Sequence, residues 1–300
     1  MSILNMPSDG LFNVAIVLAR ALVRFGPRSR DELLAACGLG VDGVDPKHLT
    51  QTLNRWTELG LFATEDKLVC LREPHRTALG KNPDIAESRL PKVLRTIALA
   101  PENNLRFFEA EENKSADLNR GLSWILAQDI YTIDTSSHAR IEALEGSQVA
   151  DKAKRMLQND TRWNGLRTWM IYLGFARSGS PVTIDPTLAL RESLDEIFGT
   201  EQSLAATLFV DRIAEVLPVL DGGSYRKRIE DLLKGSTWAR PPADTLSTAL
   251  SRAIRRLGHE GVIATEQRSD TEQGVTLVGA EQRPWLRMTH VRRIATRKGK

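Results

Sequence analysis

The chain has 300 residues, of which 41% are hydrophobic and 26% charged, and its formal net charge is +3. This composition excludes a disordered chain and suffices for two or more domains that each bury a core. The sequence has no run of about 18 apolar residues, and the N-terminal MSILNMPSDG lacks the basic and apolar segments of a secretory signal. We therefore expect a cytoplasmic protein without a membrane span.

Positive charge is concentrated in the last third of the chain. Residues 1–200 carry 24 Lys and Arg against 26 Asp and Glu, whereas residues 201–300 carry 17 against 12. The last 18 residues, 283–300, hold seven basic side chains and no acidic one. We expect a basic C-terminal tail, which either follows a phosphate backbone or is simply solvated.

The first structural unit is predicted over residues 10–75. The apolar stretch Phe12–Val23 predicts a buried helix, and DELLAAC, with acids in its first turn, predicts a short second one. Asp45-Pro46 is typical of the start of a third helix, with Asp as N-cap and Pro in the first turn. A hairpin over 61–71, turning at 65–67, is expected to follow.

A pattern in that third helix recurs about two hundred residues later. Each copy places three apolar side chains at i, i+4 and i+7, then a glycine suited to a left-handed helix end, then a short apolar run. The two copies are Leu49, Leu53, Trp56, Gly60-Leu61-Phe62 and Leu250, Ile254, Leu257, Gly261-Val262-Ile263. Both are typical of the last helix and wing of a winged helix-turn-helix, a helix shaped for the DNA major groove.

The second unit is expected to span residues 200–282. It would contain helices over 204–220, 225–233 and 244–257, and two strands between 262 and 278 that pair around the polar turn SDTEQG. The middle, 81–199, is predicted to be mostly helical, with linkers at 79–84 and 187–200. The fold class is therefore mainly α with small β wings: winged-helix units at 1–80 and 200–282, a helical middle, and a basic tail at 283–300.

The middle also contains fainter copies of the repeated pattern, which leave a third and a fourth winged-helix-like unit open. One copy comprises Leu118, Leu122, Ile125 and Ile130-Tyr131, and the other Leu166, Met170, Leu173 and Gly174-Phe175. The alternative is that these are ordinary amphipathic helices, which show the same spacing.

The polar faces of the two candidate recognition helices differ. The C-terminal helix and the basic residues after it are predicted to bind nucleic acid, because arginine contacts phosphate and guanine; they are Thr248, Ser251, Arg252, Arg255, Arg256, His259, Arg268, Arg292 and Arg293. The N-terminal helix is predicted to bind a partner protein or to form a second DNA face through Lys47, Gln51, Asn54 and Arg55, with Trp56 and Phe62 as apolar anchors near the surface. Residues 1–75 carry 8 basic and 9 acidic side chains, which favours a protein partner. For both helices a solvated polar face is the alternative.

The motifs of common enzymes give no catalytic site. Gly38–Gly43 matches G-x-G-x-x-G but follows a helix rather than a strand, so no dinucleotide site is expected. Asp45 with Glu65-Asp66-Lys67 is similar to the loose metal site of restriction nucleases, yet Asp45 is expected to cap a helix and the others to occupy a hairpin tip. The five histidines have no metal-ligand spacing, and Cys37 and Cys70 are expected in the core. We expect no enzyme, cofactor or metal.

Two stretches carry a family resemblance. MSILNMPSDGLFNVAIVLARAL and LGFARSGSPVTIDPTLALRESL are similar to those of the DpdG proteins, which accompany the 7-deazaguanine DNA modification and restriction gene clusters of bacteria. The resemblance implies a component of a multi-protein restriction and phage-defence system, and it supplies no catalytic residue.

Together these observations favour a non-enzymatic DNA-binding component of such a system, which contacts double-stranded DNA through its C-terminal unit and other proteins of the system through the rest. One alternative is an adaptor whose winged helices hold only proteins, and another is a transcriptional regulator. Assembly into a homo-oligomer is left open.

Overall fold

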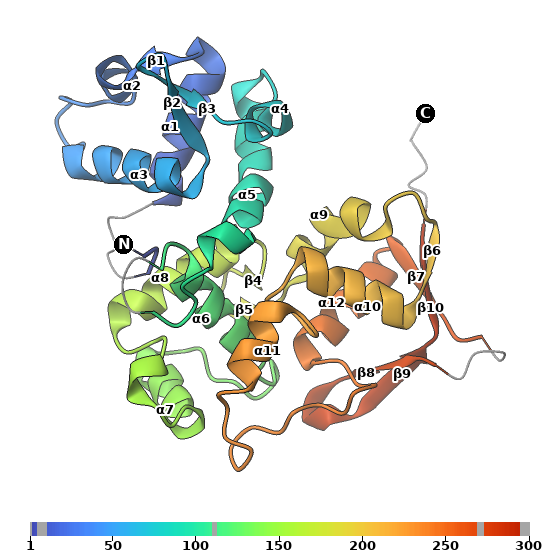
Figure 1. Ribbon diagram of the computed structural model, residues 1–300. Coiled ribbons are helices and arrows are strands. Elements are labelled where there is room, and N and C mark those ends of the chain that lie inside the picture. Colours follow the sequence, from blue (N-terminus) through green and yellow to red (C-terminus); the bar gives the residue numbers. More distant parts are fainter. Residues whose placement is uncertain (1, 5–10, 110–112, 269–272, 295–300) are drawn as a thin grey trace. The chain divides into compact units, whose positions relative to one another are not determined.

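The computed structural model describes residues 2–4, 11–109, 113–268 and 273–294 (Figure 1). Over these residues the fold is mainly helical, with small antiparallel sheets, as expected from the sequence. Within the same ranges, no helix has both the length and the apolarity needed to cross a bilayer.

The chain divides into two compact units, each built from two segments. Unit 1 comprises residues 1–119 and 161–173, and unit 2 comprises 120–160 and 174–300. The expected domain limits at 80 and 199 do not coincide with this division, because residues 81–199 are shared between both units. Helix α6 (Ala116–Leu126) begins in unit 1 and continues into unit 2.

Residues 12–71 of unit 1 form the three helices and the hairpin predicted from the sequence, and also a short strand, β1, that was not predicted. They are α1 (Phe12–Phe25), β1 (Arg28–Ser29), α2 (Arg30–Ala36), α3 (Pro46–Leu59), β2 (Phe62–Glu65) and β3 (Leu68–Leu71), with sheet order β1-β3-β2. Local signals fix the boundaries. Ser29 and Glu32 form a capping box on α2, Asp45 caps α3, and Gly60 ends α3 with φ of 103°.

The remaining elements of unit 1 pack around this part. They are α4 (His75–Leu79), α5 (Pro83–Leu99), the short helix η1 (Pro101–Asn103) and α8 (Asp160–Tyr172). Helix α5 packs on α1, and Trp169 of α8 contacts Trp56 of α3 with ring centroids 5.8 Å apart. The buried Asp117 carboxylate accepts the backbone N–H groups of Ile3 and Leu4, which anchors the N-terminal residues.

Unit 2 contains a second three-stranded sheet with the same kind of strand order. Its elements are α7 (His138–Gln148), η2 (Lys152–Lys154), β4 (Ala176–Arg177), β5 (Thr183–Ile184), α9 (Thr187–Phe198), β6 (Ser203–Ala205), α10 (Ala206–Val216), α11 (Ser224–Glu230), α12 (Thr248–His259), β7 (Ile263–Glu266), β8 (Val275–Val278), η3 (Ala280–Gln282), β9 (Pro284–Met288) and β10 (His290–Arg293). The order β6-β10-β7 corresponds to β1-β3-β2, and α9, β6, α10 and α12 correspond in turn to α1, β1, α2 and α3.

Several predictions for unit 2 are wrong. The expected linker at 187–200 contains helix α9, whose apolar face is buried, and the helix expected from 204 begins at 206 after a strand. The helix expected from 244 begins at Thr248. Because β7 pairs with β10 and β8 with β9, the two predicted strands are not partners. Residues 284–293 of the expected tail are strands, while 295–300 lie outside the described residues.

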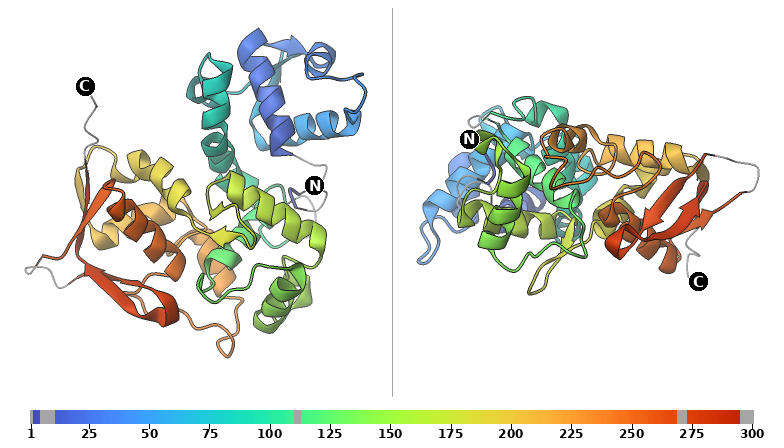
Figure 2. Two further views of the ribbon diagram at one scale, coloured as in Figure 1. Left: turned by 180° about the vertical axis from the view of Figure 1, so that it is seen from behind. Right: turned by 90° about the horizontal axis from the view of Figure 1, so that it is seen from below.

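Strands β7 and β8 therefore run antiparallel to β10 and β9, and the chain turns back between β8 and β9 at residues 279–283 (Figure 2). The turn predicted at SDTEQG lies largely outside the described residues. Only Thr289 separates β9 from β10, so one nearly continuous strand pairs first with β8 and then with β7. The middle of the chain has one small hairpin among its described residues, in which β4 and β5 pair around residues 178–182 after α8.

Candidate nucleic-acid interface

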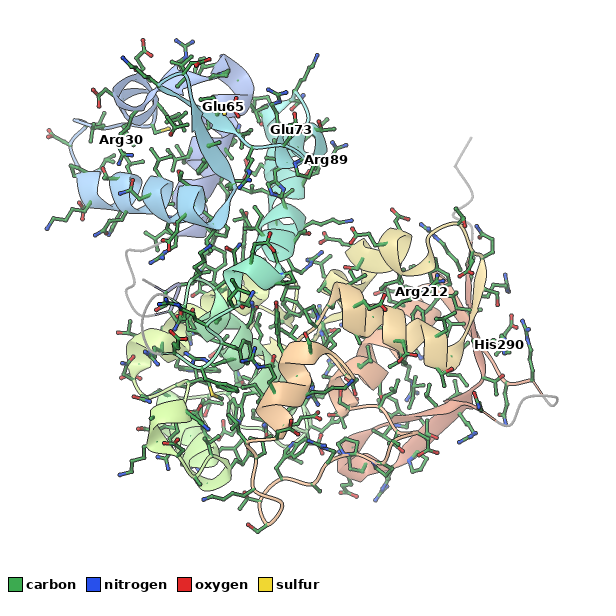
Figure 3. All side chains as sticks on the ribbon, viewed as in Figure 1. Arg30, Glu65, Glu73, Arg89, Arg212 and His290 are labelled. Atoms are coloured by element: carbon green, nitrogen blue, oxygen red, sulfur yellow. The ribbon has the colours of Figure 1, made fainter. Side chains whose placement is uncertain are left out.

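Helix α3 presents a polar face to solvent. Lys47, Asn54 and Glu58 are exposed and Gln51 is partly exposed, as the sequence predicted. Arg30, the first residue of α2, donates a hydrogen bond of 2.9 Å to Oδ1 of Asn54 (Figure 3). The capping box sets this contact, because it starts α2 at Arg30 and so places this side chain beside α3. Sequence reasoning missed Arg30, although its place after an N-cap serine could have identified it.

Three residues predicted near this face are buried instead. Arg55 is 2% exposed and donates hydrogen bonds to Glu58 and to the backbone oxygen of Ser2. Trp56 and Phe62 lie in the core of unit 1 and are not surface anchors. The i, i+4, i+7 pattern correctly gave the inward direction of Trp56, and α8, distant in sequence, covers its ring.

The first half of α12 is buried on nearly every side. Thr248 and Ser251, predicted to be exposed, are 1% and 0% exposed. Thr248 Oγ1 accepts the Ile130 N–H, and Ser251 Oγ accepts the Val278 N–H. The chain around 128–131 and strand β8 therefore cover the part of α12 that a recognition helix would insert into a groove.

The three arginines of α12 lie in different surroundings. Arg256 and Arg252 are 31% and 25% exposed at their side chains, and both face the fully buried carboxylate of Asp185. Arg256 pairs directly with Asp185, whereas Arg252 Nε lies 3.9 Å from Oδ2. Arg255 and His259 are exposed. Arg256, one of the residues predicted to bind nucleic acid, is therefore paired with a buried carboxylate of its own unit.

The other predicted basic residues lie on β10 or just after β7. Arg268 and Arg292 both donate hydrogen bonds to the Glu266 carboxylate. These hydrogen bonds lower the pKa of Glu266, and the bond from Arg268 has the larger effect. Arg293 pairs with Asp195 of α9. These arginines thus have acidic partners within unit 2, which reduces their local excess of positive charge.

Two aromatic residues that the sequence did not single out lie beside α12. The Arg255 guanidinium is 4.3 Å from the ring centroid of Trp285, and the Trp285 and Tyr131 centroids are 6.0 Å apart at 76°. Trp285 could have been identified from the sequence, because it is an aromatic residue within the basic segment that begins at Arg283. Tyr131 had none, because it comes from a part of the chain distant in sequence.

A cavity of about 730 Å³ lies within unit 2, a size common for small-molecule sites. Its walls come from residues 127–148, 237–248 and 276–284. Trp238 donates to the backbone oxygen of Ala127, and the buried Gln148 accepts from Trp124 and donates to Gln128. These polar groups hold distant segments of unit 2 together.

The residues whose spacing is similar to a nuclease metal site have local structural roles. Oδ1 of Asp45 accepts the Lys47 N–H at 2.8 Å as the cap of α3. Asp66 and Lys67 occupy the tight turn between β2 and β3 with positive φ. In the ranges that the structure describes, no three His, Cys, Asp or Glu side chains gather as a metal site would need.

Comparison with known proteins gives a family and no closer relative. No curated protein matches the chain, and no solved structure matches it either. The model of the DpdG-like family matches residues 1–271 and therefore covers α1 to β7, but not β8 to β10. Because this match covers most of the 300 residues, the chain belongs to the DpdG-like family.

Proposed function

We propose that this chain is a non-enzymatic component of the Dpd system that binds double-stranded DNA through the outward face of α3. Membership of the DpdG-like family indicates a role in the Dpd system. We further propose that 12–71 and 187–293 are winged-helix units. The shared order of helix, strand, helix, helix and strands, with a three-stranded sheet of the same order in each, supports this assignment.

The accessibility of α3 is the observation that carries the proposal. Its side chains Lys47 and Asn54 are exposed, and Arg30 reaches the same face. Gln51 is partly exposed, with its Oε1 atom buried. Lysine and arginine neutralise phosphates, whereas glutamine and asparagine pair bidentately with adenine. Helix α12, which the sequence favoured for this role, has its first half covered by its own unit.

The test is duplex binding measured by fluorescence anisotropy over a range of salt concentrations. Each phosphate contact contributes a slope of about −0.9 in a plot of log K against log salt. Lys47→Ala should therefore flatten the slope by about 0.9, while Lys81→Ala, an exposed lysine away from α3, should leave it unchanged. Asn54→Ala should cost about 1–3 kcal/mol on sites with the preferred base and little on others. An unchanged slope in Lys47→Ala would refute the role of α3.

A second candidate function is an adaptor that binds only proteins. Unit 1 favours it through large apolar side chains at its surface, among them Val17, Phe25 and Val41, which are 44%, 47% and 60% exposed. The adaptor hypothesis predicts that Val41→Ser, close to the start of α3, releases proteins that co-purify from the native host. It also predicts that wild-type protein shows no duplex binding at low salt, an outcome opposite to that of the first proposal.

A further inference from the structure

A compact surface beside α12 combines exposed aromatic and cationic groups. We call Tyr131, Arg252, Arg255 and Trp285 the α12 patch. Tyr131 is 39% exposed, and Trp285 is partly exposed and makes an edge contact with it. A Cβ at Gly279 would lie 2.0 Å from Nε1 of Trp285, so the ring fits closely against a position that only glycine can occupy. The aromatic pair is therefore held in place by packing.

The α12 patch also carries two cations, one of which has no carboxylate partner among the described residues. Arg252 and Arg256 share the single buried carboxylate of Asp185. Arg255 makes no ion pair with any described residue and instead lies over Trp285. Burial raises the pKa of Tyr131, the guanidinium groups of Arg252 and Arg255 lower it, and the carboxylates of Asp129 and Asp185 raise it further. Both cations therefore lie close to the phenol.

The geometry of α12 disfavours a duplex as the ligand of the patch. A major groove receives the first turns of a recognition helix, and in α12 these turns are covered by residues 128–131 and by β8. A single strand needs no such penetration. It is bound by aromatic rings on which its bases stack and by cations that hold its phosphates, and its bases are already free to reach a ring.

We propose that the α12 patch binds single-stranded nucleic acid, with a base stacked on Tyr131 and flanking phosphates at Arg252 and Arg255. This site is independent of the duplex-binding face proposed on α3. Trp285 restricts the position of the Tyr131 ring through their edge contact, and it restricts the Arg255 guanidinium through the cation–π contact. Arg256 takes no part, because its guanidinium is committed to Asp185.

The experiment measures anisotropy of a labelled oligothymidylate, its oligouridylate counterpart and a duplex of equal length. Tyr131→Leu removes the ring and should weaken single-strand binding about tenfold or more, at an unchanged salt slope. Tyr131→Phe keeps the ring and should bind as the wild type does. Arg255→Gln should flatten the slope by about 0.7, the value per contact on single strands. Arg140→Gln, which removes an exposed arginine of α7, is the matched control and should leave the slope unchanged.

Distinct outcomes separate this proposal from the one on α3. Lys47→Ala should weaken duplex binding and leave oligothymidylate binding unchanged, while Tyr131→Leu should do the reverse. The thermal midpoint of each variant identifies any loss of folding, and Tyr131→Phe tests the stacking without that risk. The proposal is overturned if Tyr131→Phe binds as weakly as Tyr131→Leu, if neither single strand binds the wild type, or if Arg255→Gln keeps the wild-type slope.

Discussion

Removal of the Arg256 side chain should destabilise unit 2 far more than removal of its neighbour Arg255. Asp185 is fully buried, and its carboxylate accepts hydrogen bonds from the backbone and hydroxyl groups of Thr187 and pairs with Arg256. Breaking a buried ion pair by removing one partner typically costs about 3–5 kcal/mol. Arg256 is 31% exposed and Arg252 lies near, so we expect the lower limit, about 3 kcal/mol.

Arg255→Ala provides the comparison on the same helix. Arg255 is exposed, and the substitution removes its contact with Trp285, worth about 0.5–1 kcal/mol at such sites, and an exposed hydrogen bond of 3.4 Å from Nε to Nε2 of His259. Urea unfolding followed by circular dichroism should separate the two variants. With an m-value of about 1–3 kcal/mol/M, Arg256→Ala should lower the midpoint of unit 2 by about 1 M or more.

A double-mutant cycle assigns the cost to the buried charge. Asp185→Asn removes the charge, so in that background Arg256→Ala should lose most of its effect. The reasoning is refuted if Arg256→Ala costs less than about 1 kcal/mol, a value typical of exposed ion pairs. It is also refuted if Arg256→Ala costs as much in the Asp185→Asn background as it does in the wild-type protein.

Three further predictions concern unit 1. Burial raises the pKa of Cys37 to about 11. This thiol should therefore react slowly with Ellman's reagent at pH 8 in native protein and rapidly in urea. The contribution of the neutral thiol to stability should be intact below pH 9 and lost as the pH rises toward 11. Rapid native labelling of Cys37, read by peptide mass spectrometry, would contradict this. Asp45→Ala should lower stability by about 1 kcal/mol and Asp45→Asn by much less, since asparagine also caps helices. Plasmid DNA should stay supercoiled with wild-type protein and Mg²⁺. Nicking by the wild type that is lost in Asp45→Asn would instead indicate a nuclease.

The sequence predicted unit 1 better than unit 2 because the signals in unit 1 are local. The caps at Ser29 and Asp45 and the left-handed Gly60 each act within a few residues, and the β2–β3 hairpin closes over two residues. Such short-range signals determine where α2, α3 and the hairpin begin and end.

In unit 2 the decisive contacts join residues far apart in the chain. Strand β10 lies in a basic stretch and becomes the central strand only because β6 and β7 pair with its two edges. The burial of Thr248 depends on residues near 130, which no local pattern relates to α12. Helix α9 could have been found, because Leu190, Leu194 and Ile197 have the same i, i+4, i+7 spacing that identified α3.

The path of the chain between the two units limits how this protein can be cut or recombined. The chain passes from one unit to the other after residues 119, 160 and 173. Cleavage at a single position therefore releases neither unit intact. A truncation at residue 80 would also remove the contacts of α1 with α5 and of α3 with α8. Separate expression of unit 2 therefore requires a short linker in place of 161–173.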